Sequence, residues 1–167
     1  MNMKRILSVF ASLAILFGAT TFVANAQYNN GGNPGIAIAG SATSSQLPDK
    51  AKSFIKKHFK DVGMRCCENY YAKGKIEVEL NNGVDLEFDT KGQIVEIDAP
   101  DNMLLSSSVV KEILPHKAYS RLEKDGLINS VESIEFSKGK VYEVDLNIPD
   151  PDTYLFTPEG IFIAIED

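Results

Sequence analysis

The sequence predicts an α+β protein in which a helix followed by a four-stranded antiparallel meander occurs twice in tandem, with the helices packed on one face of the sheet. Two patterns predict this fold. The second half of the chain repeats the first, and in both halves apolar residues alternate with charged residues in short runs that end at turns. Residues 47–167 can bury one sizeable core, whereas two halves of that segment would each be marginal alone. A shared or continuous sheet is therefore expected.

The repeat consists of three matched blocks in the same order along the chain. They are LPDKAKS at 47–53 with LPHKAYS at 114–120, KGK at 73–75 with KGK at 138–140, and FDTKG at 88–92 with FTPEG at 156–160. The recurring residues are apolar or belong to turns, so the repeat predicts architecture and identifies neither a ligand nor a reaction. It divides the chain into a first repeat at 47–98, a connector at 99–113 and a second repeat at 114–167.

Each repeat is predicted to open with a helix, because a Leu-Pro pair precedes an apolar stripe with helical spacing. The stripes consist of Ala51, Phe54, Ile55 and Phe59 in the first repeat and of Ala118 and Leu122 in the second. Asp125-Gly126 is typical of a helix end. Residues 106–110 are assigned to the connector.

The strands are predicted by a period of two. The residues expected to face the core are Ile76, Val78, Leu80, Val84, Leu86, Phe88, Val95 and Ile97 in the first repeat and Tyr142, Val144, Leu146, Tyr154, Phe156, Ile161, Ile163 and Ile165 in the second. A further strand is expected around 65–71 and around 130–137. Asn81-Asn82-Gly83 indicates a tight hairpin, whereas the loop at 147–152 carries two prolines. One inserted residue near Val141 is expected to form a bulge.

Residues 1–26 have the pattern of a signal peptide, with Lys4 and Arg5 before an apolar stretch and the small-residue motif Ala24-Asn25-Ala26. Cleavage after Ala26 is expected to place the mature chain in the periplasm or outside the cell, without membrane attachment. Residues 27–46 are rich in Asn, Gly and Ser and are expected to form a flexible linker.

The mature chain is acidic. Removal of Lys4 and Arg5 leaves 15 basic and 23 acidic residues, a net charge of −8. Nucleic acids and anionic membranes are poor partners for such a chain. A protein or peptide partner, in particular a basic one, and a divalent cation are both compatible with this charge. The sequence identifies neither the partner nor the oligomeric state.

The outward face of the first hairpin is the candidate partner-binding surface. Its candidate residues are Glu77, Glu79, Asp85, Glu87 and Asp89, with Tyr70 and Tyr119 as aromatic anchors. Three interpretations stay open: a solvated sheet face, an acidic platform for a basic partner, and a weak calcium site. The apolar residues of the connector, which are Met103, Leu104, Leu105, Val109 and Val110, either extend a binding surface or pack between the repeats.

The sequence predicts no catalytic residue, no cofactor and no metal site. Cys66 and Cys67 are adjacent in a predicted strand, so they point to opposite faces, and one of them is expected in the core. His58 is expected to be partly buried beside Phe59, and His116 is expected to be exposed. The spacing of these residues lacks the elements typical of a zinc site.

Leu47-Pro48 before an amphipathic helix, the hairpin VELNNG at 78–83 and the segment LEFDTKG at 86–92 together resemble the PepSY-like secreted proteins. These are related in fold to the β-lactamase-inhibitor protein and to PepSY domains. The resemblance covers residues 47–167 and implies a broad sheet surface with a non-catalytic binding role, such as inhibition of a protease. The resemblance implies no catalytic residue. The second repeat departs from the pattern, because TPE replaces DTK at 157–159 and the hairpin glycine is absent.

Overall fold

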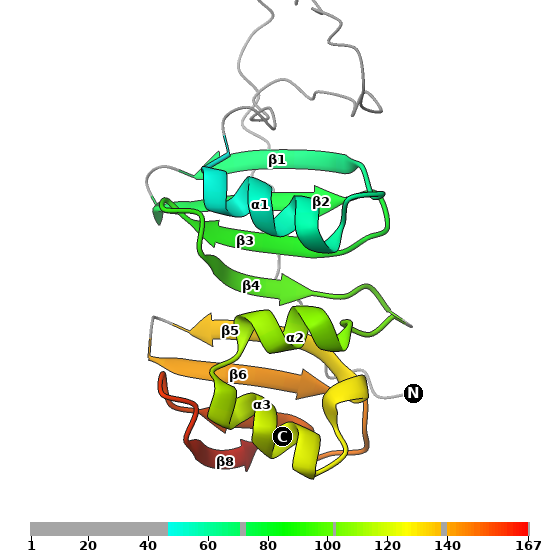
Figure 1. Ribbon diagram of the computed structural model, residues 1–167, viewed down its shortest axis with the longest axis vertical. Helices are drawn as coiled ribbons and strands as arrows, with labels where there is room; N and C mark the ends of the chain where they lie inside the picture. Colours follow the sequence, from blue (N-terminus) through cyan, green and yellow to red (C-terminus); the bar gives the residue numbers. More distant parts are fainter. Residues whose placement is uncertain (1–46, 71–72, 102, 138–139, 167) are drawn as a thin grey trace, which may run out of the picture. The chain divides into compact units, whose positions relative to one another are not determined.

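The computed structural model describes residues 47–70, 73–101, 103–137 and 140–166 (Figure 1). The predicted signal peptide and linker lie outside the described residues. The helices are α1 (Asp49–His58), α2 (Ser107–Ile113), α3 (His116–Lys124) and the 3-10 helix η3 (Ile128–Ser130). The strands are β1 (Met64–Tyr70), β2 (Lys75–Leu80), β3 (Asp85–Asp89), β4 (Ile94–Asp98), β5 (Val131–Ser137), β6 (Val141–Leu146), β7 (Thr153–Phe156) and β8 (Phe162–Glu166).

All eight strands form one antiparallel sheet, in the order β1 to β8. The sheet is continuous because β4 pairs with β5, through Glu96 with Glu135, Ile97 with Ile134 and Asp98 with Ser133. The α+β class and the expectation of a shared sheet are confirmed. We refer to α1 with β1–β4 as the N-terminal half and to α2, α3 and β5–β8 as the C-terminal half.

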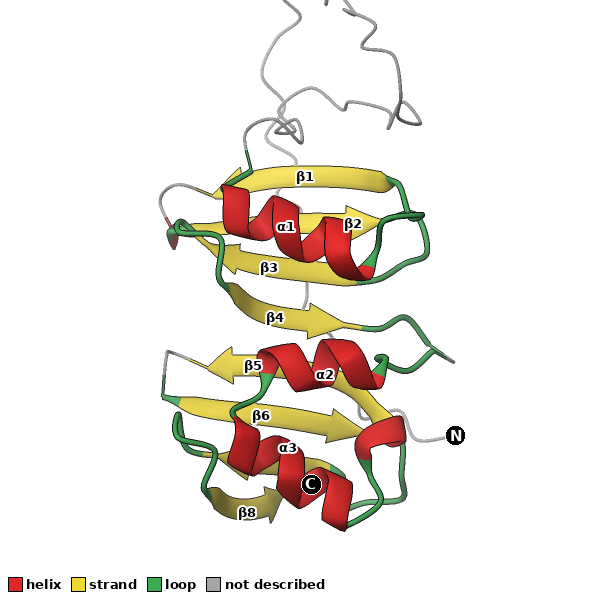
Figure 2. Ribbon diagram, in the orientation of Figure 1, coloured by secondary structure: helices red, strands yellow, loops and turns green. Residues whose placement is uncertain are grey.

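The three α-helices cover one face of this sheet (Figure 2). Alternate strand residues point toward them, and Val78, Phe88, Val144 and Phe156 are among the fully buried side chains. Phe54 of α1 packs edge-on against Phe88, with ring centroids 6.1 Å apart. Burial of each side chain of this size contributes roughly 2–3 kcal/mol relative to exposure. The predicted period of two is therefore confirmed for β2, β3, β6 and β7.

Two glycine turns hold the sheet close to helix starts. Gly92, with φ +76°, follows β3, and Gly160, with φ +78°, follows β7. A Cβ atom on Gly92 would lie 2.7 Å from Pro48 Cβ, and one on Gly160 would lie 2.8 Å from the backbone nitrogen of Ala118. Both positions require glycine for two reasons, the left-handed backbone and the close approach.

The connector is not merely a loop, because it contains α2. Ser106 caps this helix by accepting a hydrogen bond from the Val109 backbone N–H at 3.4 Å. Leu105, Val109 and Val110 are buried in the common core. Of the two interpretations of this apolar segment, packing is confirmed for these three residues. Met103 and Leu104 are instead exposed.

Two further predictions about the strands are wrong. The residue inserted near Val141 does not form a bulge, because every residue of β6 from Val141 to Leu146 has a cross-strand partner in β5. Instead, β6 begins one residue after its Lys-Gly-Lys motif, whereas β2 begins at the last lysine of the matching motif. The bulges lie elsewhere, where Arg65 in β1, Val95 in β4, Glu132 in β5 and Ile163 in β8 are left without a cross-strand partner.

The isoleucines of β8, and Ile161 just before it, do not enter the core as predicted. Ile161, Ile163 and Ile165 are 53%, 49% and 38% exposed. Phe162 packs against the core instead, with its ring centroid 5.9 Å from that of Phe156. The bulge at Ile163 breaks the alternation, and β8 is the last strand of the sheet, so no strand among the described residues lies along its outer flank.

Candidate functional site

The sheet face opposite the helices carries an unbroken row of glutamates. The six residues of this glutamate row are Glu68, Glu77, Glu87, Glu96, Glu135 and Glu143, one from each strand from β1 to β6. Each is the direct cross-strand partner of the next. Because side chains directly opposite in antiparallel strands have Cβ atoms about 5 Å apart, the row brings together carboxylates that are distant in sequence.

A parallel second row crosses all eight strands beside the glutamate row. Its members are Cys66, Glu79, Asp85, Asp98, Ser133, Asp145, Thr153 and Glu166. We call the surface formed by the two rows the acidic face. Its position follows from the pleat, since the alternation that buries Val78 and Leu86 directs their neighbours outward.

Two basic side chains pair with carboxylates on this face. Lys75 Nζ lies 2.7 Å from Glu77 Oε1 and 2.5 Å from Glu87 Oε2, so it bridges two members of the glutamate row. Arg65 Nη1 lies 2.6 Å from Glu79 Oε1. Burial alone would lower the pKa of Lys75, but its bonds to Glu77 and Glu87 outweigh burial and raise the pKa above its ordinary value.

Burial and the crowding of like charges raise the pKa of three carboxyl groups on the acidic face. Burial, followed by repulsion from Glu135 and Glu87, raises the pKa of Glu96 to about 7. Burial and the charges of Glu79 and Asp98 raise the pKa of Asp85 to about 6. Burial also raises the pKa of Glu135. These three carboxyl groups therefore bind protons more tightly than ordinary carboxyl groups do, and a cation placed beside them would favour the charged forms.

Four of the predicted site residues, Glu77, Glu79, Asp85 and Glu87, lie together on the acidic face. Asp89 lies at its margin, where its Oδ1 accepts hydrogen bonds from the backbone N–H groups of Lys91 and Gln93, both at 2.8 Å. Its carboxylate therefore stabilises the turn after β3.

The two predicted aromatic anchors lie on different faces of the sheet. Tyr70, on β1, donates its hydroxyl hydrogen bond to Glu68, which raises the pKa of Tyr70 to about 12. Lys73 Nζ lies 5.3 Å from the centroid of this ring. Tyr119 belongs to α3 on the helical side, where Lys111 Nζ lies 5.6 Å from its ring centroid. The structure does not bring Tyr119 together with the acidic hairpin.

Sequence reasoning missed more than half of the acidic face. The missed carboxylates are Glu68, Glu96, Asp98, Glu135, Glu143, Asp145 and Glu166. A signal for two of them was available, because Glu143 and Asp145 in KGK-x-x-E-x-D match Glu77 and Glu79 in KGK-x-E-x-E once the inserted residue of the second repeat is allowed for. Glu96 and Glu135 could be brought together only by the β4–β5 pairing.

The thiols and histidines do not form a reactive constellation. Cys67 is buried, as one of the two cysteines was expected to be, and burial raises its pKa to about 11. Burial also raises the pKa of Cys66, whereas reactive thiols need a lowered one. The His58 side chain is nearly buried, and its Nε2 lies 2.7 Å from Glu112 Oε2, whereas His116 is exposed.

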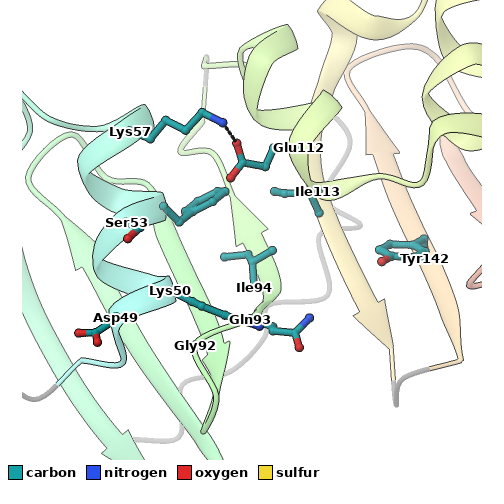
Figure 3. A pocket seen from close by; sticks show the side chains of 11 residues that line it. Asp49, Lys50, Ser53, Lys57, Gly92, Gln93, Ile94, Glu112, Ile113 and Tyr142 are labelled. Carbon is teal, nitrogen blue, oxygen red and sulfur yellow. Dashed lines mark hydrogen bonds and ion pairs between the residues drawn. The ribbon is translucent and has the colours of Figure 1, made fainter.

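A groove of about 520 Å³ lies on the helical side between α1 and α2 (Figure 3). Its wall includes Ile94, Ile113 and Tyr142, and Lys57 bonds to Glu112 across it. This bond lowers the pKa of Glu112. The lining mixes apolar and charged side chains without an arrangement of nucleophile and base.

Two absences concern only the residues that the structure describes. No group of three or more His, Cys, Asp or Glu side chains in that part of the chain is arranged to hold a metal ion. None of its helices combines the length and the apolar character that crossing a bilayer requires.

The fold and the acidic face define a class of α+β proteins in which helices cover one side of an antiparallel sheet and leave the other side polar. A family described as "Putative beta-lactamase-inhibitor-like, PepSY-like" matches residues 37–96 and 74–164. The chain belongs to this PepSY-like family, as its motifs indicated. No curated protein matches the sequence.

Three solved structures from Bacteroides species share the fold, and each covers 76% of this chain. A "putative calcium-regulated periplasmic protein" from Bacteroides thetaiotaomicron is 26% identical, with a TM-score of 0.61 and 95% of that chain covered. A "putative periplasmic protein of unknown function" from Bacteroides vulgatus is 25% identical, with a TM-score of 0.59 and 97% covered. A second protein from Bacteroides vulgatus is 25% identical, with a TM-score of 0.58 and 95% covered.

Proposed function

We propose that this chain is an exported, non-catalytic binding module that docks a basic protein or peptide on its acidic face, as an inhibitor or regulator of a secreted or envelope protein. The observation that carries the proposal is the glutamate row. Six glutamates placed directly opposite one another are costly to the isolated fold, because like charges in cross-strand pairs are destabilising. A partner that supplies Lys or Arg side chains offsets this cost on binding.

The raised pKa values of Glu96 and Asp85 support the same proposal. Glu96 lies at the middle of the sheet, and Asp85 lies opposite Glu79, where the charge of Arg65 only partly offsets burial and the neighbouring carboxylates. A basic partner would convert their protonated forms to carboxylates. Binding is therefore expected to release protons near neutral pH and to weaken as salt screens the charges.

Export and the absence of catalysis are further parts of the proposal. The signal peptide predicted at residues 1–26 and the periplasmic descriptions of the related structures support export. The raised pKa values of both thiols and the inhibitor-like description of the family support a binding role rather than catalysis.

We also propose that the two halves are copies of one ancestral unit. Bulges at Arg65 and Glu132 interrupt β1 and β5, and bulges at Val95 and Ile163 interrupt β4 and β8. β1 and β5 are the first strands of their halves, and β4 and β8 are the last. The bulges therefore lie in equivalent strands of the two halves. The approach of Gly92 and of Gly160 to a Leu-Pro helix start supports the same origin.

The test uses a synthetic lysine-rich peptide and the full chain without its predicted signal peptide. Calorimetry should show salt-dependent binding, and the double variant Glu96→Gln with Glu135→Gln should bind about tenfold more weakly, since two facing carboxylates are removed. Glu123→Gln is the matched control, because this exposed glutamate lies on α3 on the other side of the sheet. Equal binding by the double variant and the control would refute docking on the acidic face.

The partner itself is sought by capture from the secreted and periplasmic fraction of the source cell, with the same two variants as bait. We expect a basic protein that the wild-type chain and Glu123→Gln retain and the double variant loses. Capture of no protein above background, or of the same proteins by all three baits, would argue against a binding module.

A calcium-responsive envelope protein is the second candidate. The relative from Bacteroides thetaiotaomicron, described as calcium-regulated, favours it, and carboxylate oxygens are the ligands that calcium prefers. Calorimetry and thermal unfolding with millimolar calcium should then show heat and a raised melting temperature, both reduced by Glu96→Gln with Glu135→Gln. Absence of heat and of any thermal shift would remove this candidate.

A further inference from the structure

The groove between α1 and α2 leaves apolar side chains next to the core only partly buried (Figure 3). Ile94, Ile113 and Tyr142 pack against the core and line the groove, yet none of the three is fully buried. The groove volume of about 520 Å³ lies in the range of clefts that hold ligands. Covering these side chains would remove apolar surface from water, which favours binding.

The charges that line the groove balance. Lys50 and Lys57 are offset by Asp49 and Glu112, and Lys57 already donates a hydrogen bond to Glu112. A charged partner of either sign would meet a like charge and would compete with this bond. An uncharged segment that carries apolar side chains is therefore the kind of occupant that the lining favours.

The described part of the chain begins beside one end of the groove (Figure 3). Leu47 is buried just before α1, and Pro48 lies so close to the turn after β3 that a Cβ atom on Gly92 would be 2.7 Å from Pro48 Cβ. Gly92 and Asp49 both line the groove. The segment that precedes Leu47 is therefore tethered next to the groove, whereas a separate molecule would have to reach it by diffusion.

The segment at residues 27–46 has the composition that the groove favours. It contains no Asp, Glu, Lys or Arg, and its two isoleucines are Ile36 and Ile38. The match to the PepSY-like family begins at residue 37, so the family pattern extends into this segment. The residues at 39–46 can span about 26 Å when extended, whereas α1 with its 10 residues is about 15 Å long. The isoleucines can thus reach the whole groove.

We propose that residues 36–39 dock in the groove of their own chain, with Ile36 and Ile38 against Ile94 and Ile113. In an extended segment, residues two apart share one side, so both isoleucines can face the groove while the alanines face away. The short tether gives a high effective concentration, so even a weak contact is populated. The inference does not depend on the proposed function, because the groove and the acidic face lie on opposite sides of the sheet.

A spin label placed before the docking segment tests this arrangement. The protein is the full chain without its predicted signal peptide, in a Cys66→Ser background, with the label on Asn33→Cys. Cys67 is buried and should not take up the label. Because the label lies shortly before Ile36, a docked segment holds it near the groove, whereas an undocked segment lets it sample a wide volume.

In the otherwise unchanged segment, paramagnetic broadening of the NMR signals should be strong at the Ile94 and Ile113 methyl groups and weak at Ile163 on the distant strand β8. Ile38→Asp should lower the docked fraction about tenfold or more and so weaken the broadening at both groove residues, because docking would bury an unpaired charge. Asn30→Asp is the matched control, since it adds the same charge outside residues 36–39 and should leave the broadening unchanged. Circular dichroism verifies that both variants fold.

A mixed sample identifies whose segment occupies the groove. Spin-labelled chains are mixed with isotope-labelled chains that carry no spin label, and no localised broadening should appear if each chain fills its own groove. Localised broadening in the mixture would assign the segment to a second copy and overturn the proposal. Broadening that Ile38→Asp leaves unchanged, or that is equal at Ile113 and Ile163, would also overturn it.

Discussion

The two halves of the sheet use similar strands but treat their carboxylates differently. In the N-terminal half, Asp85 lies between two other acids, Glu79 on β2 and Asp98 on β4. In the C-terminal half, Asp145 lies between Ser133 and Thr153, whose hydroxyls donate hydrogen bonds to it at 2.7 Å each. In the second row, the N-terminal half therefore places like charges side by side. The C-terminal half instead pairs its aspartate with two hydroxyl hydrogen-bond donors.

This difference separates two surface properties that would conflict if they coincided. The carboxylates of the acidic face concentrate on β2–β6, where the proposed basic partner would bind. Exposed apolar side chains concentrate on β8, beyond the end of the glutamate row. A duplicated unit can thus acquire two different surfaces when hydroxyl and apolar residues replace acids in only one copy.

The largest effects should come from the matched core phenylalanines. Phe88→Ala should lower the free energy of unfolding by about 4 kcal/mol, and Phe156→Ala by about 3 kcal/mol, because Phe162 on the edge strand β8 can partly fill the second cavity. Urea unfolding monitored by circular dichroism measures both. We expect one transition, since β4 and β5 join the halves. Two separate transitions would show instead that the halves fold independently.

The glycine turns provide a finer comparison. Gly92→Ala and Gly160→Ala should each cost about 3 kcal/mol, because both combine a positive φ with a clash against a helix start. Gly126→Ala is the control: its φ is +75° but nothing lies within 4 Å, so it should cost about 1 kcal/mol. Similar costs at Gly126 and Gly92 would show that close packing against Pro48 is unimportant.

The smallest effects are those of pH on the free energy of unfolding, and substitution of Asp85 or Asp145 should change it in opposite directions. A carboxyl group whose pKa is higher in the folded state binds its proton more tightly there. The free energy of unfolding should therefore rise as the pH falls through about 7 for Glu96 and about 6 for Asp85, until the unfolded chain is also protonated. At pH 8, Asp85→Asn should stabilise the protein by about 1 kcal/mol after allowance for solvent screening.

Asp145→Asn should have the opposite sign, a loss of about 1 kcal/mol, because it weakens two hydrogen bonds to a charged acceptor. Denaturant unfolding at pH 8 and pH 5 measures both variants. If both substitutions stabilised the protein at pH 8, the contrast between the halves would be lost.

Most of the fold could be predicted because the patterns that determine its helices and strands lie within short stretches of the sequence. The alternation of Ile76, Val78 and Leu80 with charged residues determines both the strand and its buried face. Helix α2 could not be predicted in this way. Serines and the β-branched pair Val109-Val110 are poor helix formers, and burial of the valines against the sheet outweighs that propensity.

The candidate site could be predicted only in part. The sequence predicted that Glu77, Glu79, Asp85 and Glu87 share a face, because they lie on one hairpin whose strands are adjacent in the sequence. The link from Glu96 to Glu135 depends on pairing between strands separated by the whole connector and two helices. The exposure of Ile163 depends on a bulge, and the alternation of residues does not reveal a bulge.

The uninterrupted strand order also has a kinetic consequence. Seven of the eight strands pair with the strand that follows them in the chain, and six of these connections are short. Such hairpins close quickly, because little chain entropy is lost in each step. Only the pairing of β4 with β5 requires closure of a long segment, the 32 residues at 99–130. We therefore expect the two hairpin stacks to form early and their joining to limit the overall rate of folding.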